Sequence, residues 1–222
     1  MVKKAVLFDM DGILYDSEGF YMDITVSVMR ELGYTGPVEP IMDVVGTTAD
    51  GTWQILYDLL EGAWTGNEIR RRWIEKNREN PLDYKAVMFS DIPETLERLK
   101  NAGIRMACCS SNMPSVIRAS LDAMGIREYF DCVISSEEIS RPKPDPMIYL
   151  NAAEALGISP SECAVYEDSQ PGILSGKRAG MTVIARKDER FHQDQSGADR
   201  MVMNAAEMAD YILEEEPHAR GN

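Results

Sequence analysis

The sequence predicts an α/β fold in which a parallel sheet carries helices on both faces and a helical segment interrupts the chain after the first strand. Three observations predict it. Residues 3–8 form a short apolar run that is typical of a buried strand. Residues 17–85 show apolar positions at helical spacing and no convincing strand. Beyond this segment, strand-like and helix-like stretches alternate, which implies right-handed crossovers between parallel strands.

The interrupting segment is expected to form three helices. In the first, apolar side chains recur at helical spacing before a stop at Gly33, namely at Phe20, Ile24, Val28 and Leu32. The second is expected over residues 48–62. The third begins near Thr65, a residue type that caps helices, and is rich in charged side chains.

After the insertion, strands and helices are expected to alternate along the chain. Strands are expected at residues 104–110, 129–135, 164–168, 181–187 and 200–204. Helices are expected at residues 93–102, 113–125, 145–157, 171–180 and 205–216. We therefore expect an α/β core made of residues 1–15 and 88–222, a helical cap over residues 16–87, and a flexible tail over residues 215–222.

Composition and charge exclude several classes of function. The 222 residues carry a formal net charge of -14, which makes the chain a poor partner for nucleic acid or an anionic membrane surface. No apolar run is long enough to span a bilayer, and the N-terminal apolar stretch is too short for a signal peptide. We expect a cytoplasmic protein, monomeric by default, with neither nucleic acid nor membrane as partner.

Histidine and cysteine usage narrows the chemistry further. The chain has 2 histidines, His192 and His218, so a multi-histidine metal site is excluded. No GxSxG pentapeptide is present to indicate a serine hydrolase. The 4 cysteines, Cys108, Cys109, Cys132 and Cys163, are interpreted as buried, reduced core residues rather than a zinc site or a disulfide framework.

Polar side chains follow four of the expected strands, at the point where each strand ends. Asp9 and Asp11 follow the first strand, and Ser110, Ser111 and Asn112 end the second. Lys143 lies between two prolines after the third strand, and Glu167 and Asp168 end the fourth. Because the carboxyl ends of parallel strands meet at one edge of the sheet, we expect these side chains to gather there.

These residue types together favour phosphoryl transfer. Asp9 and Asp168 offer hard oxygen ligands to Mg²⁺, and the ionised Asp9 carboxylate is able to attack phosphorus. Ser110 and Lys143 would hold the phosphoryl oxygens, while Asp11 would protonate the leaving oxygen and then activate a water molecule. Taken singly, each residue has a simpler interpretation as a turn, helix-cap or loop residue. Their joint placement at four strand ends favours the catalytic one.

Four ordered stretches resemble the motifs of the haloacid dehalogenase superfamily, in its subgroup of phosphatases and phosphohexomutases similar to β-phosphoglucomutase. They are FDMDGILYDSE, ACCSSN, RPKPDP and VYEDSQPGILSGKRAGM. The resemblance covers nearly the whole chain. It implies a Rossmann-like core with a central parallel sheet and an inserted helical cap.

The resemblance also implies a role for each matching residue. Asp9 would be the nucleophile and a Mg²⁺ ligand, and Asp11 the general acid and base, with its backbone carbonyl on the metal. Ser110 and Lys143 would bind the phosphoryl group, with Ser111 and Asn112 as further substrate contacts. Asp168 would ligate Mg²⁺, with Glu167 on or beside the ion. The second aspartate indicates phosphate esters, because dehalogenases of this superfamily lack it.

Departures from the β-phosphoglucomutase pattern favour a phosphatase over a mutase. Tyr21 lies in the region where those enzymes carry a histidine, and residues 46–49 lack their arginine. In the cap, Asp16, Thr48 and Lys76 are candidate substrate contacts, although Lys76 lies in a charged helix and a solvated face explains it better. Trp53, Trp64 and Trp73 with Tyr57 are interpreted as cap core rather than a sugar-stacking surface.

The expected function is therefore a Mg²⁺-dependent phosphatase that hydrolyses a small phosphorylated metabolite, a sugar phosphate in the first instance, through an aspartyl-phosphate intermediate. Two alternatives stay open. The first is a phosphohexomutase that isomerises sugar phosphates at the same site. The second is a non-catalytic metabolite-binding module on this fold.

Overall fold

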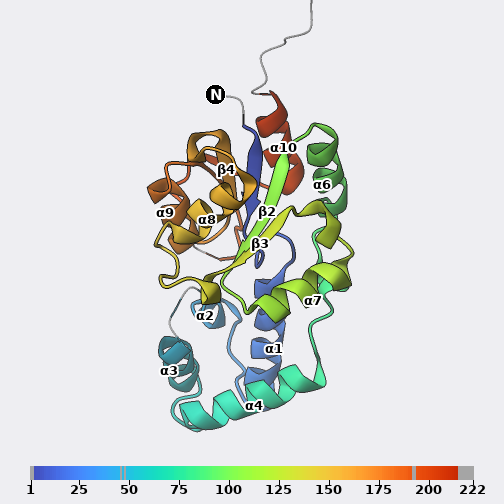
Figure 1. The fold of residues 1–222 in the computed structure, drawn as a ribbon. Helices are drawn as coiled ribbons and strands as arrows, with labels where there is room; N and C mark the ends of the chain where they lie inside the picture. The colour runs from blue at the N-terminus through green and yellow to red at the C-terminus, as the bar shows by residue number, and fades with distance from the viewer. Residues whose placement is uncertain (1–2, 46, 48, 192–193, 215–222) are drawn as a thin grey trace, which may run out of the picture. The chain divides into compact units, whose positions relative to one another are not determined.

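The structure, a computed structural model, describes residues 3–45, 47, 49–191 and 194–214. The chain divides into two compact units, whose elements are labelled in Figure 1. The first contains the residues up to Tyr15, Tyr84–Asp188 and the described residues from 194 onward. The second contains Asp16–Asp83 together with a short segment that includes Arg190 and Phe191. The chain thus leaves the first unit at Tyr15 and re-enters it at Tyr84.

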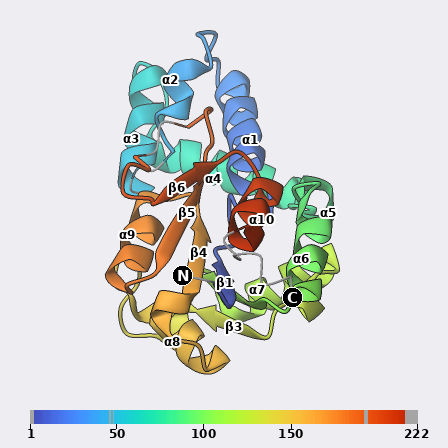
Figure 2. The same cartoon turned by 90° about the horizontal axis from the view of Figure 1, so that it is seen from above.

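A six-stranded parallel sheet forms the centre of the first unit. Its strands are β1 (Ala5–Phe8), β2 (Arg105–Ser110), β3 (Cys132–Ser135), β4 (Cys163–Glu167), β5 (Thr182–Arg186) and β6 (Arg200–Val202). They lie in the order β3-β2-β1-β4-β5-β6, and every neighbouring pair is parallel. Figure 2 labels β3, β1, β4, β5 and β6 of this sheet. This arrangement confirms the predicted α/β fold.

Helices connect the strands of the first unit, as the alternation in the sequence predicts. They are α5 (Tyr84–Val87), α6 (Ile92–Asn101), α7 (Pro114–Met124), α8 (Met147–Leu156), α9 (Gln170–Arg178) and α10 (Ala205–Glu214). Single 3₁₀ turns lie at Arg127–Tyr129, Ser136–Glu138 and Pro160–Glu162. The helices α7 and α8 end at Gly125 and Gly157, whose positive φ angles of 72° and 69° suit glycine.

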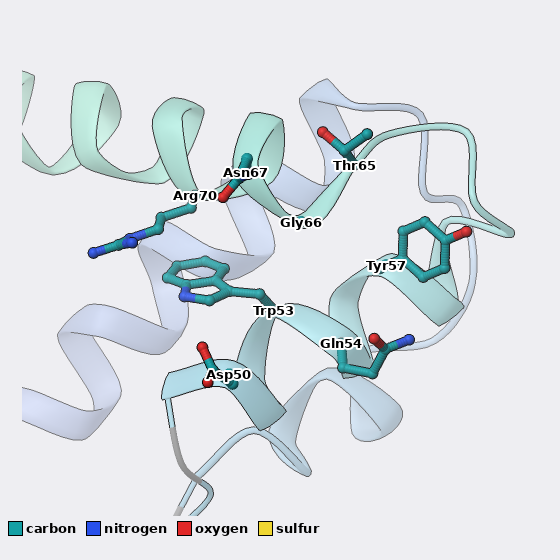
Figure 3. Close-up of a pocket in the computed structure, with 8 residues that line it drawn as sticks. All are labelled: Asp50, Trp53, Gln54, Tyr57, Thr65, Gly66, Asn67 and Arg70. Atoms are coloured by element: carbon teal, nitrogen blue, oxygen red, sulfur yellow. The ribbon is translucent and has the colours of Figure 1, made fainter.

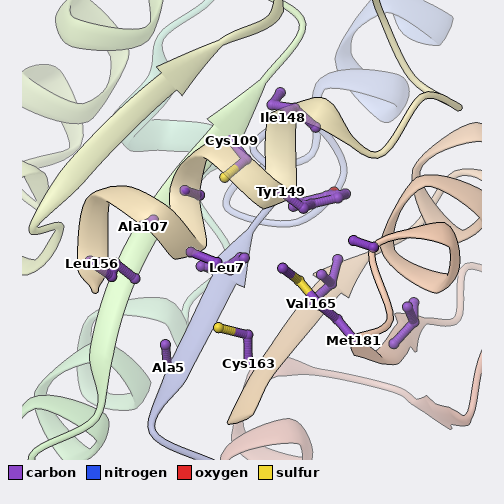
Figure 4. Packing of buried hydrophobic residues seen from close by; sticks show 14 of the residues in the cluster. Ala5, Leu7, Ala107, Cys109, Ile148, Tyr149, Leu156, Cys163, Val165 and Met181 are labelled. Atoms are coloured by element: carbon purple, nitrogen blue, oxygen red, sulfur yellow. The ribbon is translucent and has the colours of Figure 1, made fainter. Parts of the chain in front are cut away.

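The core of the first unit explains why β1 is uninterruptedly apolar. All four residues of β1 are fully buried, because the strand has neighbours on both sides and packed layers on both faces. On one face, Leu7 and the neighbouring Cys109 and Val165 pack beneath Ile148 and Tyr149 of α8 (Figure 4). This packing fixes the ends of β1, β2 and β4, from which the polar residues project.

All four cysteines are unpaired, and Cys108, Cys109 and Cys163 are buried. Burial raises the pKa of the Cys109 thiol well above its usual range and that of Cys163 to about 11. These thiols therefore stay protonated and behave as small apolar residues, as the sequence predicts.

The second unit is helical over its described residues. Its helices are α1 (Ser17–Glu31), α2 (Glu39–Met42), α3 (Ala49–Leu59) and α4 (Gly66–Glu79). Thr65 caps α4 in a capping box with Glu68, as expected for the third helix. The apolar cluster of this unit combines Met29, Ile41 and Ile69 with Phe191, which comes from the distant C-terminal segment.

Among the described residues, every helix is too short or too polar to cross a membrane.

Candidate active site

Three of the predicted site residues form one buried charged cluster at the carboxyl edge of the sheet. Phe8, the last residue of β1, is in register with Cys108 of β2 and Tyr166 of β4, so the carboxyl ends of these strands lie close together at one edge. Directly beyond them, Lys143 Nζ lies 2.5 Å from Asp9 Oδ1 and 2.7 Å from Glu167 Oε1. The Lys143 side chain is 7% exposed. The lysine therefore bridges the ends of two strands.

Glu167 is the anchor of this cluster. It is fully buried, and its Oε1 accepts hydrogen bonds from Lys143 and, at 3.2 Å, from the Tyr149 hydroxyl. Its Oε2 accepts from the backbone amides of Asp168 and Ser169, each at 2.8 Å, and from the Ser169 hydroxyl at 3.0 Å. Both oxygens are thus occupied by donors of the protein itself.

The electrostatic balance keeps Glu167 ionised. Burial tends to raise its pKa, but the ammonium of Lys143 and the hydrogen bonds from Lys143 and Ser169 outweigh burial and lower the pKa. Gly172 is required nearby, since a Cβ there would lie 1.5 Å from Glu167 Oε1. The VYEDSQPG stretch therefore builds a pocket for one carboxylate, and that carboxylate holds Lys143.

The influences on the pKa of Asp9 balance in the opposite direction. Burial is the largest influence on it, and with the charges of Glu167 and Asp11 it outweighs Lys143 and raises the Asp9 pKa from 3.8 to about 7. A buried carboxylate that is costly to ionise in this way is stabilised when a cation binds beside it.

The acidic residues fit a divalent cation. One oxygen each from Asp9, Glu167 and Asp168 lie within 4.8 Å of one another, and carboxylate oxygens are the ligands that Mg²⁺ prefers. Gly12 makes room for this group: it has a φ of 71°, and a Cβ on it would lie 2.2 Å from Asp168 Oδ2. The donor chemistry and the space kept by Gly12 both suit the expected ion.

Asp11 points to different partners from Asp9. Its Oδ1 accepts from the Tyr15 hydroxyl at 2.8 Å, and its Oδ2 accepts from Asn112 Nδ2 at 2.6 Å. The Asn112 backbone amide in turn donates to Ser110 Oγ at 3.1 Å. The two aspartates therefore lie on one loop with distinct environments, one in the lysine cluster and one held by neutral donors.

The end of β2 supplies hydroxyl groups beside this network. Ser110 is buried, Ser111 is exposed, and the Ser135 hydroxyl at the end of β3 donates to the Asn112 carbonyl at 2.6 Å. The structure thus brings the sequence-predicted residues of β1, β2 and β4 and the lysine loop to one edge, within the first unit.

The predicted cap residues belong to the second unit and have partners there. Asp16 caps α1 through the amide of Gly19 and forms a double ion pair with Arg190 at 2.7 and 2.8 Å. Lys76, whose side chain is 26% exposed, forms an ion pair with Glu31. Thr48 lies outside the described residues. Their roles as substrate contacts stay predictions.

The cap aromatics divide into two groups. The Trp64 and Trp73 indoles donate to the Leu32 carbonyl and to Thr25 Oγ1, each at 3.0 Å, so both have structural partners. Trp53 and Tyr57 instead line a hollow of about 360 Å³ between α3 and α4 (Figure 3). Its other lining residues are Asp50, Gln54, Thr65, Gly66, Asn67 and Arg70. Trp53 and Trp64 also pack against the apolar cluster of this unit, as the cap-core interpretation predicts, whereas Tyr57 is 37% exposed.

Two tyrosines at the strand edge were not anticipated. Tyr149 comes from α8, and its ring centre lies 5.1 Å from Lys143 Nζ. No sequence pattern marks it, since its position follows from how α8 crosses the sheet. Tyr15 contacts Asp11 directly. The sequence feature that could have predicted this contact is the position of Tyr15, four residues after Asp11 in FDMDGILYDSE.

Comparison with known proteins finds a family, relatives and solved structures that are similar to this chain. The sequence model of the family described as haloacid dehalogenase-like hydrolase matches residues 6–186. The phosphoglycolate phosphatase of Aquifex aeolicus is 30% identical over 182 residues, covering 80% of this chain and 81% of that protein. The β-phosphoglucomutase of Bacillus subtilis is 27% identical and covers 96% of this chain and 95% of that protein. A hydrolase structure from Deinococcus radiodurans R1, with bound phosphate and sodium, matches with a TM-score of 0.78, 27% identity and 96% coverage of both chains.

Proposed function

Because the chain belongs to the haloacid dehalogenase-like hydrolases, in their phosphatase and phosphomutase subgroup, we propose that it is a Mg²⁺-dependent phosphatase acting on a small phosphorylated metabolite. A sugar phosphate is the substrate class that the relatives favour, since a β-phosphoglucomutase matches along nearly the whole chain. The observation that carries the proposal is the buried cluster in which Lys143 joins Asp9 to Glu167.

In the first step, an Asp9 carboxylate oxygen forms a bond to phosphorus while the bond from phosphorus to the ester oxygen breaks. Lys143 and Ser110 hold the phosphoryl oxygens, because both lie at the same strand edge as Asp9. Asp11 gives its proton to the departing ester oxygen, which leaves as an alcohol. The products of this step are aspartyl phosphate on Asp9 and an ionised Asp11.

In the second step, Asp11 takes a proton from a water molecule whose oxygen bonds to phosphorus. The bond between phosphorus and Asp9 breaks, which releases inorganic phosphate and regenerates both aspartates. The separate environments of the two residues suit this division, since Asp9 lies among charges and Asp11 among neutral hydrogen-bond donors.

Asp9 and Asp168 would hold the Mg²⁺ together with the Asp11 carbonyl, and the ion would supply the positive charge that keeps Asp9 ionised and offsets charge on the phosphoryl group. We assign Glu167 to the anchoring of Lys143 rather than to direct ligation. Both of its oxygens already accept hydrogen bonds from the protein.

The test is phosphate release from a panel of sugar phosphates, nucleotides and p-nitrophenyl phosphate, with Mg²⁺ and with EDTA. Wild type is compared with Asp9→Asn and with Asp122→Asn, which removes an exposed carboxylate from α7. We expect metal-dependent release in wild type and Asp122→Asn and its loss in Asp9→Asn. Full activity in Asp9→Asn would remove Asp9 as nucleophile.

A phosphohexomutase is the second candidate, favoured by the match to β-phosphoglucomutase along nearly the whole chain. Against it, Tyr21 stacks near the Trp73 ring, with ring centres 5.7 Å apart, where mutases carry a histidine. Conversion of a hexose 1-phosphate to the 6-phosphate, with hexose bisphosphate added and no net phosphate release, would establish the mutase. Tight binding of a metabolite without either reaction would support the remaining alternative, a non-catalytic metabolite-binding module.

A further inference from the structure

We propose that Tyr15 is a positioning residue that holds the carboxylate of Asp11 in the orientation needed for proton transfer. The inference rests on the proposed function, in which Asp11 is the general acid and base. Tyr15 touches neither the phosphoryl group nor the metal in this role. It acts through Asp11 alone.

Two hydrogen bonds hold the carboxylate of Asp11, one on each oxygen. Tyr15 Oη donates to Oδ1 at 2.8 Å and Asn112 Nδ2 donates to Oδ2 at 2.6 Å. Two donors on opposite oxygens fix the plane of the carboxylate. An ionised carboxylate has roughly four lone-pair sites, so each oxygen keeps one free for the proton that is transferred.

Tyr15 is itself held in place by packing and by backbone pairing. Its side chain is 1% exposed, and its ring packs edge-on against Tyr84 with ring centres 5.2 Å apart. Its backbone is paired with Asp11 on one side and Met88 on the other, and its carbonyl accepts from the Gly12 amide at 3.0 Å. The hydroxyl position is therefore set by packing and backbone pairing, and not by its hydrogen bond to the Asp11 carboxylate.

Tyr15 and Tyr84 lie at the two points where the chain passes between the units. Tyr15 is the last residue of the first unit before the chain passes into the second, and Tyr84 is the residue at which the chain returns. The edge-on contact between the Tyr15 and Tyr84 rings thus joins the two points at which the chain leaves and re-enters the first unit. Asp11 is held by one residue of this junction and by Asn112 from the end of β2.

The test compares Tyr15→Phe, which keeps the ring and removes the hydroxyl, with Tyr84→Phe, which makes the same change on the neighbouring ring. The parameter is kcat/KM, which reports steps up to the first irreversible one, here departure of the leaving group. It is measured with the best alkyl phosphate of the panel and with p-nitrophenyl phosphate, whose leaving group needs little protonation.

We expect Tyr15→Phe to lower kcat/KM for the alkyl phosphate by roughly tenfold to a hundredfold, the effect of losing a hydrogen bond to a charged group. With p-nitrophenyl phosphate the value should stay within about twofold of wild type, because this ester needs little acid assistance. Tyr84→Phe should match wild type with both esters. In an Asp11→Asn background, Tyr15→Phe should have no further effect, because the two residues act as one unit.

Equal losses with both esters, or additive losses in the double variant, would show that Tyr15 is merely structural and would overturn the inference. An active wild type with an unaffected Tyr15→Phe would mean that Asn112 alone orients Asp11, and would overturn it as well. A wild type that hydrolyses no ester would refute the proposed function, and the inference with it.

Discussion

Replacing Asp9, the proposed nucleophile, should stabilise the metal-free protein at high pH. Asp9 is buried and its pKa is raised from 3.8 to about 7, with burial as the main cause. Between these two values the folded state binds a proton that the unfolded state has lost, so the contribution of Asp9 to stability falls as pH rises. Above pH 7 Asp9 is ionised in the folded state, and the full free-energy cost of burying its charge is present. The asparagine side chain of the Asp9→Asn variant carries no charge and should avoid this cost.

The pKa difference sets the size of the effect. A shift from 3.8 to about 7 corresponds to at most on the order of 4 kcal/mol at about 1.4 kcal/mol for each pH unit. In a chain of this length each kcal/mol moves Tm by roughly 2–4 °C. We therefore expect Asp9→Asn to melt several degrees above wild type in EDTA at pH 8.

The assay is thermal and urea denaturation of wild type, Asp9→Asn and the surface control Asp122→Asn, in EDTA at pH 5 and pH 8. The advantage of Asp9→Asn should shrink at pH 5, where the folded wild type is largely protonated at Asp9. Added Mg²⁺ should stabilise wild type more than the variant, because the variant lacks a ligand. A variant that is less stable than wild type in EDTA at pH 8 would refute the reasoning, since the Asp9 carboxylate would then be net stabilising.

Two further predictions concern the supports of the cluster. Gly172→Ala places a Cβ 1.5 Å from the present position of Glu167 Oε1, so the carboxylate has to move. We expect a loss of about 1–3 kcal/mol in unfolding free energy, measured by urea denaturation, and a reduced kcat, measured by phosphate release. Wild-type stability and kcat in this variant would contradict the close packing of Gly172 against Glu167. Lys143→Met leaves two buried carboxylates without their cation and should cost about 3–5 kcal/mol at pH 8 in EDTA. Part of that loss should return on acidification, as the carboxylates become protonated, and a loss that grows as pH falls would count against this account.

The strand-end residues were predictable because their positions follow from the sheet alone. Once four buried strands are identified, parallel pairing in register places Asp9, Ser110 and Glu167 at one edge, whatever packs elsewhere. Lys143 was identified by its loop motif. The assignments of Asp9, Ser110 and Glu167 required only the order of the elements.

What the sequence did not reveal depends on side-chain geometry or on distant packing. That Glu167 Oε2 accepts two backbone hydrogen bonds follows from local turn geometry at Asp168 and Ser169. Tyr149 reaches the cluster because of the way α8 crosses the sheet. Phe191 packs into the second unit although it lies far along the chain from that unit's helices, and no periodicity within the helices predicts such a partner.

The most direct test of the central claim, that Asp9 is the nucleophile, is detection of its phosphorylated form. In Asp11→Asn, p-nitrophenyl phosphate should still transfer its phosphoryl group, because its leaving group needs no proton, while hydrolysis of the acyl phosphate should slow without a base. Acid quench and mass spectrometry after mixing with Mg²⁺ and the ester should show one phosphoryl group on the peptide that contains Asp9. The double variant Asp9→Asn with Asp11→Asn should show none. Release of p-nitrophenol without a phosphoryl group on that peptide, or the same label in the double variant, would contradict the account.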